Sequence, residues 1–155
     1  MQRLTPNIPL PECRFLPGLG LPKPHLAVGV YDRKTQFLYG TDLFNASFFW
    51  EAHEVWEHLW RQTSDPIDAA FLKSMIQFSA AMVQQFLKRP NSSKRLVKRA
   101  LGYLSRVAET KAWPFGLDVC HWIRKWWQIS AVSESSLNGK APHVWIDPSR
   151  IIEVS

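Results

Sequence analysis

A short stretch of this sequence, Phe49–Arg61, holds the side chains best suited to chemistry. It carries three glutamates and two histidines, interleaved with three tryptophans. Imidazole and carboxylate groups on adjacent helical turns can bind a divalent metal, and a histidine with a glutamate can act as general base and acid. If the protein is an enzyme, the stretch predicts a His/Glu or metal-assisted hydrolase, with His53 as base or ligand and Glu57 as its orienting partner.

The spacing of these groups differs from the common helical metal motifs. The zincin pattern needs a second histidine four residues after the first, but that position is Glu57, and His58 follows one residue later. Di-iron bundles use Glu-x-x-His, whereas the spacing here is Glu51-x-x-Glu54-x-x-Glu57. His53 and Glu57, at i and i+4, are the pair that remains. These two could hold two positions of a divalent metal ion.

A helix over this stretch is predicted to be amphipathic. At about 100° per residue, the apolar side chains share one face and the acidic and imidazole groups share the other. In one interpretation the polar face is solvated, with i, i+4 pairs such as Glu54–His58 and Glu57–Arg61. In the other it lines a site. Trp50 lies among these charges, and an indole in that position indicates that the face is covered.

The surrounding sequence predicts the helices that would position this face. Asp32–Asn45 predicts a first helix with Gly40 as its weak point, and Asn45 or Ser47 is expected to cap the motif helix. Asp65 as cap and proline at the next position predict the start of an apolar helix. The sequence further predicts helices over 67–88, 94–109 and 117–129, with residues 90–93 as a connection.

Short connections imply that consecutive helices are antiparallel neighbours. Folding the motif helix back on the 67–88 helix brings His53 close to residues 75–77, and makes Lys73 and Gln77 the expected partners of the acidic face. The candidates for a binding groove are therefore the polar and aromatic side chains of these two helices, namely Trp50, Glu51, His53, Glu54, Glu57, Trp60, Lys73 and Gln77.

Composition predicts one folded unit with two extensions. The chain has 155 residues, of which 46% are apolar, enough to bury a core. Six of its eleven prolines lie in residues 1–30, which predicts a proline-rich arm without regular structure. We expect a helical bundle over 31–129 and an irregular or extended tail over 130–155. The arm is expected to lie extended along the domain, with a disordered leader as the alternative. An arm that crosses to a second subunit would give a homo-oligomer.

The sequence also bears on location. Its longest apolar-rich run is shorter than a membrane span, and the N-terminus lacks a signal-peptide pattern. The two cysteines, Cys13 and Cys120, have neither metal nor disulfide spacing. We expect a soluble, cytoplasmic protein without membrane contact.

Charge raises the question of nucleic acid as a partner. The formal net charge is +6, and the cations concentrate between residues 88 and 111, away from the acidic motif. A solvated helix face is the favoured interpretation of these cations, and a phosphate-binding track is the other.

The stretch Phe49–Trp60 resembles the signature of the uncharacterised bacterial and archaeal family known as domain of unknown function 309. That signature is two aromatic residues followed by Glu-x-His-Glu-x-x-Glu-x-x-Trp. The resemblance continues through Phe71–Met82 and Gly116–Asp118, and covers about residues 40–129. Trp56 stands where leucine is usual. The resemblance implies an all-helical bundle. The family has no established activity. The signature positions in this chain are Glu51, His53, Glu54, Glu57 and Trp60.

Taken together, the sequence predicts an all-α protein, a small antiparallel helical bundle. A His/Glu/Trp-lined groove between its first two long helices would bind a small ligand, a divalent metal or a peptide. The alternative is a non-catalytic protein- or RNA-interaction module in which the Glu/His cluster is a structural network.

Overall fold

Helices account for the regular structure of the described residues. The computed structural model describes residues 2–112, 114–116 and 118. It contains the helices α1 (Arg33–Asn45), α2 (Phe49–Arg61), α3 (Pro66–Phe86) and α4 (Pro90–Glu109), followed by a 3-10 turn, η1 (Pro114–Gly116). No strand occurs within these residues, so the all-α prediction is confirmed.

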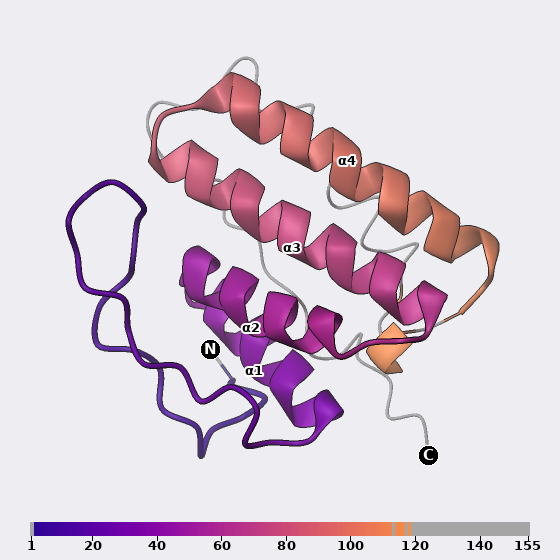
Figure 1. The fold of residues 1–155 in the computed structure, drawn as a ribbon, viewed down its shortest axis with the longest axis horizontal. Helices are drawn as coiled ribbons and strands as arrows, with labels where there is room; N and C mark the ends of the chain where they lie inside the picture. Colours follow the sequence, from indigo (N-terminus) through magenta and orange to yellow (C-terminus); the bar gives the residue numbers. More distant parts are fainter. Residues whose placement is uncertain (1, 113, 117, 119–155) are drawn as a thin grey trace.

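Each helix packs on the one that follows it. α2 lies between α1 and α3, and α3 lies between α2 and α4, with consecutive helices antiparallel (Figure 1). The connections are short enough to require this arrangement. The predicted helix at 117–129 and the predicted tail at 130–155 lie outside the described residues, apart from residue 118. None of the described helices combines the length and apolarity needed to span a membrane.

Two of the predicted helix starts are confirmed. Asp32 accepts a hydrogen bond from Thr35 N–H at 3.0 Å and caps α1. Asp65 accepts from the amides of Ile67 and Asp68 and caps α3, which begins at Pro66. Both carboxylates satisfy amides that have no partner within the first helical turn.

Two other helix starts were predicted wrongly. The N-cap position of α2 is occupied by Phe48, whose side chain makes no capping hydrogen bond. The predicted caps, Asn45 and Ser47, lie before this position. The chain instead turns tightly there, with Ser47 at a φ of 65° and Phe48 N–H donating to Leu43 O. α4 begins at Pro90, within the segment predicted as a connection. Proline suits a first helical position because an amide there needs no helical partner.

The core is centred on Trp56, which is fully buried. Its ring lies against those of Phe37 and Phe44, with centroids 6.1 and 5.8 Å away, and its Nε1–H donates to Phe37 O at 3.3 Å. The indole sits directly on the backbone of α1 at Gly40, where an added Cβ would lie 2.4 Å from Nε1. Glycine at this position is therefore what lets a tryptophan occupy the α1–α2 interface.

The proline-rich arm lies on α1 and α2 (Figure 1). Ile8 is only 4% exposed and belongs to the hydrophobic core. The buried carboxylate of Asp42 accepts hydrogen bonds from Leu4 N–H at 2.8 Å and Thr5 N–H at 2.7 Å. Tyr39 Oη donates to Pro9 O at 3.2 Å. Polar groups of the arm's own backbone thus find partners on the helices, which holds an irregular segment in place.

Candidate functional site

His53 lies where α2 faces α3, as the predicted antiparallel pairing requires. Its Nδ1 is 3.2 Å from the carbonyl oxygen of Ile76, and its Nε2 is 3.8 Å from Glu57 Oε2. A carbonyl oxygen can only accept, so Nδ1 carries the hydrogen of this bond. In the neutral ring the lone pair is then on Nε2, which lies on the side of the Glu57 carboxylate.

Three potential ligand groups converge at this point. His53, Glu54 and Glu57 each offer one atom, and these atoms all lie within 4.8 Å of one another. A metal ion held at about 2.1 Å from each would draw them about an ångström closer, which side-chain rotation can supply. The three side chains are half-buried. Glu54 was outside the predicted metal pair, although its position about 100° from His53 on the helix gave a signal for it.

The α3 wall opposite this cluster is a polar stripe that is interrupted by the apolar Ala80. Lys73 lies at one end, with its Nζ 5.2 Å from the ring centroid of Trp60 and 5.5 Å from that of Tyr103. Ala80 and Gln84 lie at the other end, near His53. Helical spacing puts Gln77 between them, and its Oε1 is buried without a hydrogen-bond partner among the described residues.

A small pocket adjoins His53. It has a volume of about 150 Å³ and lies between α2, α3 and the arm. That is room for about five water molecules, whereas pockets for drug-sized ligands begin at about 300 Å³. Its lining residues are Pro17, Trp50, His53, Ala80, Val83 and Gln84.

The arm covers Trp50, the indole that lies among the charges of the motif. The rings of Phe15 and Trp50 are 4.3 Å apart at their centroids, and Lys23 Nζ lies 5.2 Å from the indole centroid. The sequence indicated a covered face here but gave no sign of what covers it. The cover comes from a segment more than 25 residues earlier in the chain.

Glu51 faces the arm, apart from the other two motif glutamates. It is fully buried, and its Oε1 accepts a hydrogen bond from Phe15 N–H at 2.6 Å. Its Oε2 is buried without a partner among the described residues. The structure therefore places this groove candidate as an anchor for the arm, while the three residues His53, Glu54 and Glu57 form the cluster. Nothing local in the sequence distinguished Glu51 from Glu54.

Burial raises the pKa of Glu51 above its ordinary value of 4.5, against the opposing effect of the hydrogen bond from Phe15. The folded protein therefore binds this proton more tightly than the unfolded chain does. The tighter binding of this proton stabilises the folded protein. This stabilisation is fully present below about pH 4.5 and is lost as the pH rises through the raised pKa of Glu51. We expect the free energy of unfolding of the wild type, relative to that of Glu51→Gln, to fall as the pH rises through this window.

Urea unfolding of both proteins between about pH 4 and pH 8 measures this difference. Glu12→Gln, which changes an exposed carboxylate of the arm, is the control variant in the same comparison. Parallel pH profiles for wild type and Glu51→Gln would contradict the assignment.

Comparison with known proteins supports the resemblance seen in the motif. Residues 37–96 match the model of the family described as Domain of unknown function (DUF309). The match takes in most of α1, all of α2 and α3, and the start of α4, and it includes the three clustered residues. Neither a curated protein nor a solved structure matches the chain. The helical core of this chain is thus similar to a family whose function is unknown.

Proposed function

We propose that His53, Glu54 and Glu57 bind a divalent transition-metal ion in the space between α2 and α3. The observation that carries the proposal is the orientation of His53. Histidines that bind metals typically donate their second ring N–H to a carbonyl or carboxylate, which fixes the tautomer and directs the free nitrogen at the metal. The bond from Nδ1 to Ile76 O at 3.2 Å is of this kind.

The donor set and the space support an ion in preference to a larger ligand. One imidazole and two carboxylates suit zinc, iron or manganese, and exceed what an accidental i, i+4 pair would provide. The adjoining pocket of about 150 Å³ has room for water but not for a peptide side chain with its backbone.

Three protein ligands leave coordination positions open. Structural zinc sites are closed by four protein ligands, whereas hydrolytic sites keep a position for water or substrate. We therefore propose metal-assisted hydrolysis as the reaction class of this site. The chain's own contribution would be to hold the imidazole by Ile76 O and to set two carboxylates beside it.

Metal binding by the untagged full chain tests the proposal. We expect zinc or manganese to bind at one equivalent by isothermal titration calorimetry, and His53→Ala to weaken binding by at least about 100-fold, since it removes a direct ligand. His58→Ala is the matched control, because this histidine of α2 contacts Gln62 and lies on the side of Gly29 in the arm.

A second variant separates metal binding from stability. In His53→Asn the side-chain amide can still donate to Ile76 O, but no atom reaches the place of Nε2. We expect this variant to keep most of the melting temperature and to lose the metal. If the wild type binds neither zinc nor manganese, while His53→Ala lowers the melting temperature strongly, the cluster is a structural network and the proposal is wrong.

A further inference from the structure

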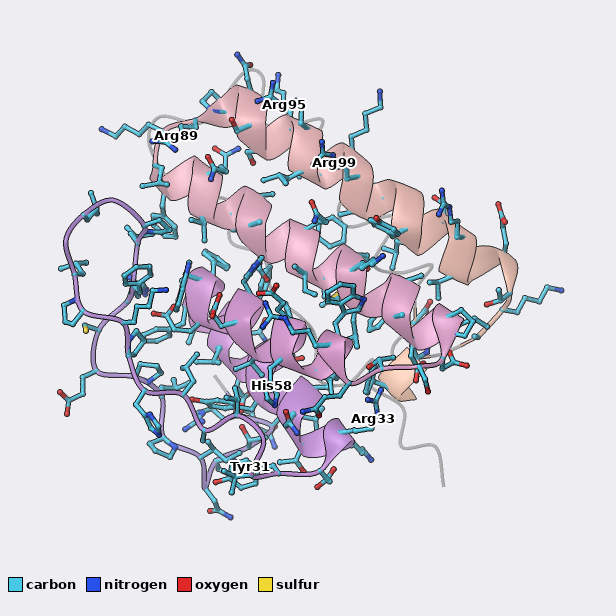
Figure 2. The ribbon with its side chains drawn as sticks, in the orientation of Figure 1. Tyr31, Arg33, His58, Arg89, Arg95 and Arg99 are labelled. Atoms are coloured by element: carbon cyan, nitrogen blue, oxygen red, sulfur yellow. The ribbon has the colours of Figure 1, made fainter. Side chains whose placement is uncertain are left out.

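One face of α4 is a continuous cationic surface, which we call the α4 cationic face. Its side chains fall within a sector of about 100° on the helix, and all are exposed. Figure 2 shows Arg95 and Arg99 extending from this helix, with Arg89 at its start. The α4 cationic face consists of Arg95, Lys98, Arg99, Gly102 and Arg106.

Acidic side chains are sparse along this part of the chain, and the nearest is Glu109, one turn after Arg106 at the end of α4. Between Asp68 and Glu109 the sequence contains no aspartate or glutamate. Arg95 and Arg106 contact neutral groups: Arg95 Nη2 donates to Ser92 Oγ at 3.2 Å, and Arg106 lies over the ring of Tyr103. Solvated helix faces usually alternate charges in i, i+4 pairs, which this face does not do. From Arg95 to Arg106 the helix therefore presents four cations with no acidic residue between them in the sequence.

Gly102 lies in the middle of this face without a packing reason. A Cβ added there would meet nothing within 4 Å. Glycine inside a helix costs about 1 kcal/mol relative to alanine. Its effect here is to leave bare helix backbone between Arg95 and Arg106, so that a chain of phosphates could lie close to the helix axis with cations on both sides.

A hollow adjoins the start of the α4 cationic face. It has a volume of about 360 Å³, and its polar lining groups are two guanidiniums, a hydroxyl and an amide, all of which can donate to a phosphate oxygen. The lining residues are Gln84, Ser92, Arg95, Leu96 and Arg99.

We propose that the α4 cationic face binds the phosphate backbone of a double-stranded nucleic acid, without reading its bases. Charge complementarity selects a polyanion. A membrane surface is disfavoured because an interfacial helix needs large apolar side chains beside its cations. The described large hydrophobics that are exposed lie elsewhere, at Leu19, Leu21, Val30, Tyr31 and Phe86.

A single strand is disfavoured for a different reason. Proteins that bind single strands stack bases on free aromatic rings. Tyr103, the ring next to this face, already lies against the cations of Lys73 and Arg106. A duplex keeps its bases stacked and presents mainly its phosphates. Four cations around the exposed helix backbone at Gly102 suit such a ligand. This proposal does not depend on the metal site of α2.

Fluorescence anisotropy with the full chain and a labelled duplex of about 20 base pairs tests the proposal. Four phosphate contacts predict a slope of about −3.6 in log affinity against log salt, which is about a 100-fold loss between about 50 and 200 mM salt. Duplex RNA and duplex DNA of the same sequence should both bind. Vesicles of anionic phospholipid are the comparison for a membrane surface.

Variants make the test specific to this face. Arg95→Gln and Arg99→Gln should each reduce the salt slope by about 1. Lys34→Gln, an equal loss of charge on the exposed start of α1, should leave it unchanged. Gly102→Gln should raise the melting temperature, because it removes a helix glycine, and should still weaken duplex binding several-fold. A flat salt dependence, equal effects of Arg99→Gln and Lys34→Gln, or binding to vesicles alone would overturn the proposal.

Discussion

Replacing Gly40 by alanine is expected to destabilise the protein by about 2–3 kcal/mol. The new Cβ would lie 2.4 Å from Trp56 Nε1 and 2.8 Å from Cδ1 and Cε2 of the same ring. The indole cannot move aside, because it is fully buried, bonded to Phe37 O and packed against Phe44. Urea unfolding of wild type and variant measures the difference.

Gly102 is the matched control for Gly40, since both glycines lie within helices. At Gly102 the added Cβ meets nothing, so Gly102→Ala should stabilise the protein by about 0.5–1 kcal/mol. Trp56→Leu should remove the conflict at Gly40, so that Gly40→Ala costs little or nothing in that background. Equal effects of alanine at both glycines, or no coupling between Gly40 and Trp56, would contradict this account of the α1–α2 interface.

Asp42→Ala is expected to destabilise the protein by about 3–5 kcal/mol and to release the arm. Asp42 is 1% exposed and accepts three hydrogen bonds from the arm, from Leu4 N–H, Thr5 N–H and Thr5 Oγ1. Alanine would leave these buried donors without an acceptor, at about 1–3 kcal/mol each if they stayed buried. The arm should therefore leave the surface and expose Ile8.

Trypsin digestion under native conditions reports on the arm, which contains the cleavable residues Arg3 and Arg14. Cleavage there should be faster in Asp42→Ala than in the wild type, and unchanged in Glu12→Ala, which removes an exposed carboxylate of the arm. Asp42→Asn keeps the shape of the side chain and should give an intermediate effect, which covers the case in which Asp42→Ala does not fold. Unchanged stability and cleavage in Asp42→Ala would show that Asp42 does not hold the arm.

The helices could be predicted because their signals are local. Asp65 lies two or three residues from the amides that it caps, so sequence alone identified it as a cap. Asp32 was predicted as the first residue of its helix, and the structure shows that it caps that helix. The cap of α2 was missed because the turn before it depends on backbone geometry, with Ser47 at a positive φ. The start of α4 was missed because the sequence predicted residues 90–93 as a connection, although proline also suits a first helical position.

The candidate site was only partly predictable. His53 and Glu57 are one turn apart, so their pairing follows from the helix period. The bond between His53 and Ile76 O follows from the antiparallel packing of α2 on α3, which the short connection predicted to within a residue or two. The role of Glu51 was not predictable, since its partner amide belongs to Phe15, 36 residues earlier in the chain.

By itself, the sequence determined the helical class, the order of the described helices, and the presence of carboxylates and imidazoles on one surface of α2. These properties depend on neighbours within a few residues, where spacing alone specifies geometry. Only the tertiary structure decided which glutamate is an anchor for the arm and which belongs to the cluster, and why Gly40 must face Trp56. Those outcomes arise where segments distant in sequence come into contact, and residue spacing carries no record of such contacts.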